Sequence, residues 1–342
     1  MRTRISTILS RCMVALVAVA MAATMVACSS GGGEAQPATT EAAPTEVRVA
    51  SLSGPTSIGL VEMMDRAEAG EYANDYDFTV AGVADEVTTG LIQGDYDIAL
   101  LPANAASVVY NKTEGEISVV DVNTLGVLYV VTGDESVTSF ADLAGRTVYT
   151  TGKGTTPEYA LNYLLEENGI ADQVTVEFKS EASELAAVLQ SDPDAICVLP
   201  EPFATATMAQ NEGLHRVCGL TDEWAAVQGE DGSSMVTGVT VVRNDFLEEH
   251  PEAVAEFVDA QAASVEWVNE NPDEAGELVA EVGIIEKAQM AARAIPNCSL
   301  VCVTGDEMRT ALEGYLQVLY DQDPASVGGE MPGDAFYATD VA

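Results

Sequence analysis

The chain has 342 residues, which is long enough for about two domains and a sizeable apolar core. It carries 14 Lys and Arg against 55 Asp and Glu, a formal net charge of −41 at pH 7. Phosphate backbones are bound by basic surfaces, so this charge excludes nucleic acid as a partner and disfavours adsorption to anionic lipid. Hydrophobic residues make up 47% of the chain, which predicts a globular protein rather than a disordered one.

The N-terminus has the pattern of an export signal. Arginines precede an uncharged apolar run, residues 13–26, that is short for a membrane-spanning helix. The run leads into Ala27-Cys28 and resembles a bacterial lipobox, with ordinary cleavage after the alanine as the alternative. We predict a lipoprotein signal peptide over residues 1–27, lipid attachment at the cysteine and a flexible linker over residues 28–45.

The rest of the chain alternates apolar runs with helical patterns. Strands are predicted at residues 46–52, 77–82, 96–101, 119–122, 125–132, 146–150, 174–179, 195–199, 214–220 and 236–243. Helices are predicted at residues 58–69, 86–93, 157–168 and 183–190, and again along most of the chain after Arg243. Repeated strand–helix–strand units predict parallel sheets covered by helices, so the fold class is α/β.

The alternating region before the helical tail is longer than one modest open sheet requires, which predicts two lobes. Residues 46–128 and 240–342 are assigned to lobe 1 and residues 129–239 to lobe 2, so the chain crosses between the lobes twice. Ligands of such sheets bind at the carboxyl ends of strands. We therefore expect a ligand cleft between the lobes, lined by the loops that follow the strands.

Polar loops follow several of these strands and supply the candidate site. The candidate ligand-binding residues are Gly54, Pro55, Thr56, Ser57, Asn104, Thr151, Gly152, Lys153, Thr155, Thr156 and Glu201. Amides and hydroxyls in the loop of residues 54–57 suit an anion at a helix N-terminus, although Thr56 or Ser57 could simply cap that helix. Asn104 is expected either to donate to a ligand or to cap the helix that it begins.

The loop of residues 151–156 is the richest candidate. Its glycines let the backbone approach a ligand, its threonines offer hydroxyls and Lys153 offers a charge, while a flexible turn with a helix cap is the alternative. Glu201 would favour a cationic or donor-rich ligand. No arginine falls in the predicted cleft loops, which argues against a simple oxyanion and for a neutral or cationic heterocycle.

The cysteines leave two interpretations open. Cys12 is removed with the signal and Cys28 is lipidated, so the candidate disulfide partners are Cys197, Cys218, Cys298 and Cys302. An oxidising exterior permits two disulfides among them, in three connectivities. Burial of Cys197 and Cys218 as small apolar residues is the alternative. The spacing of Cys298 and Cys302 is not typical of zinc sites, and no metal is expected.

Five segments carry a family resemblance through their order along the chain. They are residues 54–59, 94–99, 140–146, 200–203 and 243–273. Together with the lipobox and linker, they resemble the nitrate/sulfonate/taurine-type solute-binding lipoproteins of ABC importers, a group that includes thiamine-precursor binders. The resemblance covers residues 46–320 and implies the two-lobed type II periplasmic-binding-protein fold, with a ligand cleft between the lobes.

The resemblance also implies a function. A small solute, either an organic anion or a nitrogen heterocycle, would be captured in the cleft and delivered to an ABC permease, without catalysis or a cofactor. We expect a monomer outside the cytoplasm, held at the bacterial cell membrane by its lipid anchor alone. A ligand-sensing surface lipoprotein and an enzyme on the same fold are the alternatives. Neither His215 nor His250 lies in a predicted cleft loop, which disfavours the enzyme.

Overall fold

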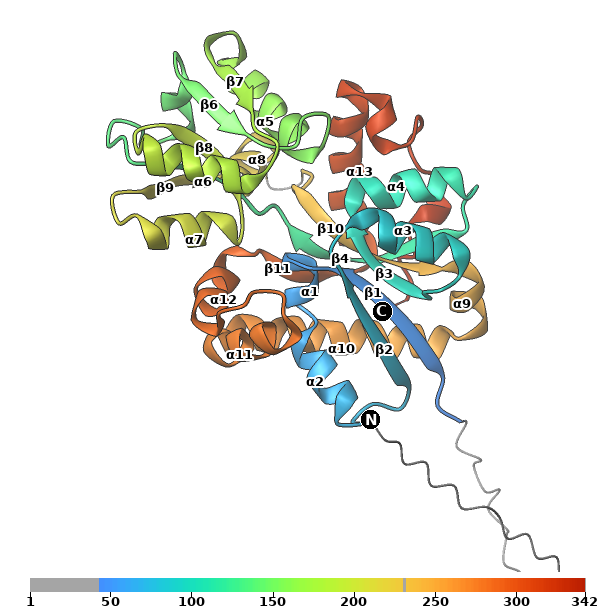
Figure 1. Ribbon diagram of the computed structural model, residues 1–342. Helices are drawn as coiled ribbons and strands as arrows, with labels where there is room; N and C mark the ends of the chain where they lie inside the picture. Colours follow the sequence, from blue (N-terminus) through green and yellow to red (C-terminus); the bar gives the residue numbers. More distant parts are fainter. Residues whose placement is uncertain (1–42, 230–231, 342) are drawn as a thin grey trace, which may run out of the picture. The chain divides into compact units, whose positions relative to one another are not determined.

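The computed structural model describes residues 43–229 and 232–341, so the signal peptide, Cys28 and most of the linker lie outside the described residues. The first of its two sheets, sheet A, has the strand order β11-β4-β10-β3-β1-β2 (Figure 1). Its strands are β1 (Glu46–Leu52), β2 (Asp75–Ala81), β3 (Ile98–Pro102), β4 (Ile117–Leu125), β10 (Val236–Arg243) and β11 (Leu300–Val303). β1 is parallel to β2 and β3, whereas β10 is antiparallel to both β3 and β4.

The second sheet, sheet B, has the strand order β7-β6-β8-β5-β9. Its strands are β5 (Leu128–Thr132), β6 (Thr147–Thr150), β7 (Thr175–Phe178), β8 (Ile196–Pro200) and β9 (His215–Gly219). β6 is parallel to β7 and β8, and β5 is antiparallel to β8 and β9. The mixed α/β architecture with two sheets confirms the predicted fold class.

Helices cover both sheets. The α-helices are α1 (Pro55–Ile58), α2 (Val61–Glu68), α3 (Ala84–Gln93), α4 (Ala103–Lys112), α5 (Thr156–Glu167), α6 (Ala182–Ser191), α7 (Phe203–Gln210), α8 (Leu220–Gln228), α9 (Asn244–Glu249), α10 (Pro251–Glu270), α11 (Pro272–Val282), α12 (Ala288–Ala294) and α13 (Gly305–Gln322). The short helices are η1 (Phe140–Leu143), η2 (Ala171–Gln173), η3 (Ile295–Asn297), η4 (Pro324–Val327) and η5 (Asp334–Phe336). None of the helices in the described part of the chain is long and apolar enough to span a membrane.

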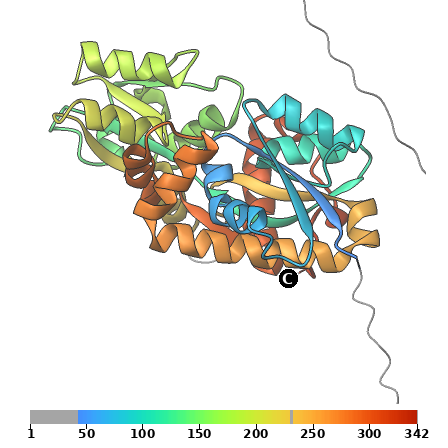
Figure 2. The same ribbon diagram turned by 60° about the horizontal axis from the view of Figure 1, so that its bottom comes forward.

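Alternation along the strands explains why sheet A carries helices on both faces. Along β3, Ile98 and Leu100 pack with Phe257 of α10, whereas Ala99 and Leu101 pack with residues of α3 and α4. Successive side chains of a strand point to opposite faces, so both faces of this apolar strand are buried. Figures 1 and 2 show α10 along one face of the sheet and α3 and α4 on the other.

The chain passes between the sheets at two places. The first passage is the short connection from β4 to β5, which contains Gly126 and Val127, and the second runs from β9 through α8 to β10. The single strand predicted over residues 125–132 is wrong, because β4 ends at Leu125 and the next strand belongs to the other sheet. The predicted lobe boundaries, after residue 128 and before residue 240, fall inside β5 and β10.

The C-terminal helix α13 connects the two parts of the core. Its Tyr315, Leu312 and Leu316 belong to an apolar cluster that also contains Val148 of sheet B and Trp224 of α8. The ring centroids of Trp224 and Tyr315 lie 5.5 Å apart, and neither side chain reaches solvent. Large aromatic side chains bury much apolar surface, so this contact stabilises the fold across the two sheets.

Candidate ligand-binding site

The predicted site residues lie on four connections, each after the carboxyl end of a parallel strand. In sheet A, β1 leads into α1 and β3 leads directly into α4. In sheet B, β6 leads into α5 and β8 leads into α7. Because parallel strands share one carboxyl edge, the first two connections gather at one edge of sheet A and the other two at one edge of sheet B.

The hydroxyls of the first loop are engaged within the loop. Thr56 Oγ1 donates to the Leu52 carbonyl at 3.0 Å, and Ser57 Oγ lies 2.5 Å from the same oxygen and 2.6 Å from Ser51 Oγ. Gly54 is the N-cap of α1, and no side chain caps this helix. Because α1 has four residues, its dipole is small. The backbone of this loop, more than its hydroxyls, is therefore what a ligand would meet.

The same loop packs against the strands that lead to the passages between sheets. A Cβ atom added to Gly238 of β10 would come within 2.7 Å of Thr56 Cγ2 and 2.5 Å of Asn123 Oδ1. No side chain larger than a hydrogen fits between them without movement. The glycine at this position thus allows the β1–α1 loop to approach β4 and β10 closely.

A buried polar network continues from this contact into the core. Asn123 donates to Thr240 Oγ1 at 3.1 Å, and Thr240 Oγ1 and Gln261 Nε2 each lie 3.0 Å from Asp121 Oδ1. Asp121 is fully buried, and its Oδ2 has no hydrogen-bond partner among the described residues. Burial raises the pKa of Asp121 to about 7, although the hydrogen bonds from Thr240 and Gln261 oppose the shift.

Asn104 faces the C-terminal segment rather than capping a helix. It is the second residue of α4, whose N-cap is Pro102 without a side-chain cap. Its Nδ2 atom lies 3.5 Å from the carbonyl of Ser326, in η4. That distance is at the long end for a hydrogen bond, so the amide is only weakly engaged.

The loop before α5 closes on itself. Thr155 Oγ1 donates to the Gly152 carbonyl at 2.6 Å, and Gly154 N donates to Glu158 Oε2 at 2.5 Å. Gly152 and Gly154 have φ angles of 73° and 75°, the left-handed region that favours glycine. Thr155 is the N-cap of α5, but its side chain does not bond the helix, so it does not form a capping box with Glu158.

Lys153 is exposed at the tip of this loop. Its Nζ lies 5.7 Å from the ring centroid of Phe178, the last residue of β7. The ammonium group of Lys153 therefore lies near the carboxyl edge of sheet B. The cation–π contact with Phe178 orients this group without neutralising its charge. Thr151 and Thr156 are half-buried at the two ends of the loop.

Glu201 already has a cationic partner within the chain. Its side chain is buried, and its Oε1 accepts hydrogen bonds from Thr205 Oγ1 at 3.0 Å and from Arg216. Its Oε2 accepts from Thr205 N at 3.2 Å. Burial raises the pKa of Glu201, while the Arg216 charge and the Thr205 bonds lower it. The charge that Glu201 would offer to a ligand is thus matched by Arg216.

Arg216 is the functional candidate that sequence reasoning missed. It lies on β9, with its guanidinium 4.1 Å from the ring centroid of Tyr129 of β5, and it also donates to Asn297 Oδ1. Its side chain is 23% exposed, its Nε is buried without a hydrogen-bond partner among the described residues, and its two terminal nitrogens bond Asn297 and Glu201. The sequence contains one signal for Arg216. An arginine within an apolar strand needs a buried acceptor, so a carboxylate partner could be expected.

The four cysteines within the described residues are free thiols. Cys197 and Cys298 are buried, and Cys218 and Cys302 are half-buried. Burial raises the pKa of Cys197 and of Cys218 to about 12, so both thiols are protonated and unreactive at neutral pH. Within residues 43–229 and 232–341, no group of three or more His, Cys, Asp or Glu is arranged to hold a metal ion.

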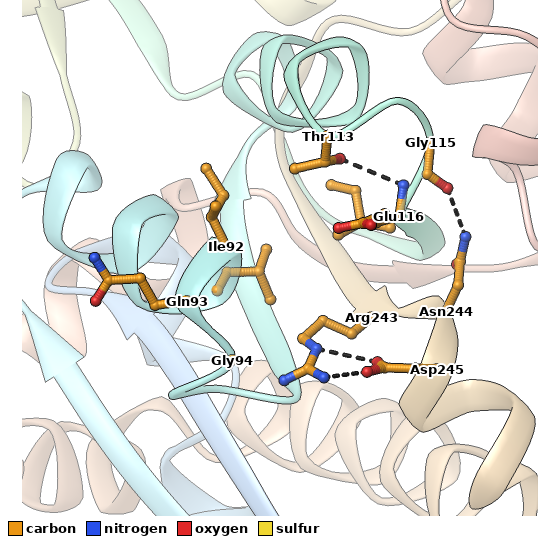
Figure 3. Close-up of a pocket in the computed structure, with 11 residues that line it drawn as sticks. Ile92, Gln93, Gly94, Thr113, Gly115, Glu116, Arg243, Asn244 and Asp245 are labelled. Carbon is orange, nitrogen blue, oxygen red and sulfur yellow. Dashed lines mark hydrogen bonds and ion pairs between the residues drawn. The ribbon is translucent and has the colours of Figure 1, made fainter.

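A hollow of about 350 Å³ lies apart from the predicted residues (Figure 3). It is bordered by the start of β4, the end of β10 and the last residues of α3. Arg243 points toward Asp245, and Asn244 donates to the Gly115 carbonyl at 2.8 Å. A neighbouring hollow of about 390 Å³ shares Arg243 and Asp245. The Arg243 guanidinium beside these hollows is therefore paired with Asp245 of the same chain.

Solved structures define the class of this fold. An ABC transporter protein from Parabacteroides distasonis aligns with 86% of this chain and 99% of its own, at 24% identity and a TM-score of 0.71. The periplasmic aliphatic sulphonate binding protein SsuA from Escherichia coli aligns with 84% of this chain and 91% of its own, at 12% identity and a TM-score of 0.67. The periplasmic nitrate-binding protein NrtA from Synechocystis PCC 6803 aligns with 74% and 70%, at 13% identity and a TM-score of 0.51.

These likenesses confirm the predicted two-lobed periplasmic-binding-protein fold. A family model described as NMT1/THI5 like matches residues 87–275, more than half of the chain. The chain belongs to the NMT1/THI5-like family, and the resemblance to nitrate/sulfonate/taurine-type binding proteins is confirmed. No curated protein sequence matches the chain significantly.

Proposed function

We propose that the chain is an extracytoplasmic solute-binding lipoprotein that captures a small molecule between two lobes and delivers it to an ABC permease. Lobe 1 comprises residues 46–128 and 240–342, and lobe 2 comprises residues 129–239. The observation that carries the proposal is the placement of four connections at the carboxyl edges of two sheets, joined by two passages of the chain. The fold and the family support a binding role.

The solute is an organic anion or a nitrogen heterocycle, and the contacts favour the anion. Glu201, the main argument for a cationic ligand, is satisfied by Arg216 and Thr205. Lys153 remains exposed, whereas Arg216 is paired with Glu201. A cationic side chain and loop amides together suit a carboxylate or sulfonate. Proteins of this fold include sulphonate and nitrate binders, which supports the same choice.

A thermal-shift screen of the chain tests the proposal. The panel contains sulfonates, nitrate, aromatic acids, thiamine precursors and polyamines. A ligand present at about 100 times its Kd adds roughly 2.7 kcal/mol, which moves the melting temperature by several degrees. We expect one chemical class to shift the midpoint and to be recovered unchanged, as a binding protein without catalysis requires. Conversion of the bound compound would instead identify an enzyme.

Lys153→Ala is expected to weaken binding of an anionic solute by roughly 10- to 100-fold, because a hydrogen bond to a charged group contributes about 1.5–3 kcal/mol. The melting temperature of the free protein should hardly change, since the side chain is exposed. Isothermal titration with the solute from the screen measures the change. Lys112→Ala, an exposed lysine at the end of α4, is the matched control. Equal affinities for wild type and Lys153→Ala would place the site elsewhere.

Cys28→Ser is expected to abolish lipid attachment and to move the protein from the membrane fraction to the soluble fraction of the producing cells. A thioether to lipid requires the cysteine sulfur, and a net charge of −41 gives the body no electrostatic affinity for anionic lipid. Fractionation with mass measurement of the N-terminal peptide reports both changes. Membrane retention of the serine variant would contradict the lipid anchor.

A further inference from the structure

The lobes contact each other on two sides. On one side, α13 packs its Tyr315 and Leu316 into the same apolar cluster as Trp224 of lobe 2. Tyr159 of lobe 2 also accepts a hydrogen bond from Gln322 at 3.0 Å and donates one to Asp323 at 3.1 Å there. On the other side, α12 packs against α7 of lobe 2, and Asn297, at the end of η3 in lobe 1, accepts hydrogen bonds from lobe 2. Apolar burial is lost gradually and at high cost when surfaces separate, whereas a few hydrogen bonds can be exchanged for water. The hydrogen bonds at Asn297 are therefore contacts that can open and close.

Asn297 accepts two hydrogen bonds from lobe 2. Tyr129 Oη donates to its backbone carbonyl at 2.8 Å, and Arg216 donates to its side-chain Oδ1. Its own Nδ2 lies 3.3 Å from the Arg293 carbonyl in lobe 1. The Asn297 carboxamide is thus oriented by a hydrogen bond within lobe 1 and accepts a hydrogen bond from Arg216 of lobe 2.

The donors of lobe 2 are held in place without Asn297. The Arg216 guanidinium stacks 4.1 Å from the Tyr129 ring centroid and is paired with Glu201. Glu201 is in turn fixed by two bonds from Thr205. A donor group that is already oriented loses little entropy when its acceptor arrives, so the bonds to Asn297 form at low cost.

The contact lies beside the first passage between the sheets. Ser299, two residues after Asn297, donates through Oγ to the Gly126 carbonyl at 2.9 Å and accepts through its own carbonyl from Leu125 N at 3.0 Å. Thr221, at the start of α8, also donates to the Gly126 carbonyl at 2.9 Å. Any rotation of one lobe against the other must therefore change the surroundings of residues 125–127 and of Asn297 together.

We propose that Asn297 is a brace between the lobes, which Tyr129 and Arg216 bind when the lobes are together and release when they separate. The brace sets the ratio of closed to open protein, and through it the time for which a solute is retained. The effect on retention time rests on the proposed function. The ratio of closed to open protein does not, because the protein has this ratio even without solute. A hydrogen bond to a charged group that is lost only in the open form changes this ratio by about tenfold or more.

The test compares the full chain with Asn297→Ala and Tyr129→Phe, without added solute. Small-angle X-ray scattering measures the radius of gyration, and hydrogen exchange measures protection of residues 125–128. We expect a larger radius and at least tenfold faster exchange there in Asn297→Ala, with a smaller change in Tyr129→Phe, which keeps the ring beneath Arg216. Asn168→Ala is the control and should match wild type, because the side-chain amide of this C-cap residue bonds the Leu164 carbonyl of α5.

Scattering and exchange that match wild type in both variants would overturn the proposal. If Asn297→Ala fails to fold, Tyr129→Phe decides alone, because it removes one hydroxyl and leaves the apolar packing intact. The test of the brace can be distinguished from the test of the proposed function. A wild-type chain that binds no solute refutes solute capture, whereas the solute-free comparison still supports or refutes the brace.

Discussion

Asp121→Asn is expected to change how the stability of the protein depends on pH. The free energy of unfolding of the variant minus that of wild type should be about 4 kcal/mol larger at pH 8 than at pH 4. The pKa of Asp121 is raised to about 7 in the folded protein, because the side chain is fully buried. Its value in the unfolded chain is about 3.9. The folded state therefore holds a proton that the unfolded state releases between these two pH values.

The sign follows from this difference. The stabilisation by the raised pKa is complete below about pH 4 and is lost as the pH rises through about 7, because ionised Asp121 has only two donors and an unpaired Oδ2. Asparagine does not ionise and escapes this loss. Its amide nitrogen has no acceptor in place of Oδ2, which costs about 1 kcal/mol at every pH.

Urea unfolding of wild type and Asp121→Asn between pH 4 and pH 8 measures this effect. Asp172→Asn, at an exposed position in η2, is the matched control for the loss of a carboxylate. Two stability curves that run parallel across this range would show that Asp121 is ionised in the folded protein throughout, and would refute the account of the buried network.

Arg216→Met is expected to lower the free energy of unfolding by about 3–5 kcal/mol. The methionine keeps much of the packing against Tyr129 but removes the only cation that contacts Glu201 among the described residues. Glu201 is 3% exposed, so its carboxylate would be left buried with Thr205 as its remaining donor. An unpaired buried charge is among the most destabilising changes in a protein core.

A double-mutant cycle isolates the ion pair. Glu201→Gln removes the charge, so Arg216→Met should cost much less in that background, and the double variant should recover most of the lost stability. Denaturant unfolding of the four proteins gives the coupling energy. An equal cost of Arg216→Met in both backgrounds would mean that the destabilisation comes from lost packing instead of an orphaned carboxylate.

Local patterns predicted the elements whose signals are local. β1 and β10 have the predicted bounds, because each is an apolar run of strand length that ends near a turn or a polar residue. The helix predicted over residues 157–168 corresponds to α5, which has Pro157 near its start and Gly169, with φ 67°, beyond its end. β11 was missed, since the four-residue run Leu300–Val303 carries no length or turn signal.

Long-range partners could not be read from the sequence. The strand predicted over residues 125–132 divides between two sheets, because apolar character alone does not specify which sheet a strand joins. The hydroxyls of Thr56 and Ser57 were expected to meet a ligand or to cap the helix, yet both donate to the Leu52 carbonyl. The meeting of Glu201 with Arg216 depends on the pairing of β5 with both β8 and β9. When only the sequence is known, charged residues that neutralise each other through such strand pairing have the pattern of ligand-binding groups.

Native mass spectrometry of the chain, after incubation with a small-molecule extract and removal of the excess, tests solute capture most directly. We predict one small molecule bound per chain, released on denaturation with an unchanged mass and retained less well by Lys153→Ala. A chain that never carries a small molecule, or that releases a chemically altered one, would contradict a binding protein that hands its solute intact to a permease.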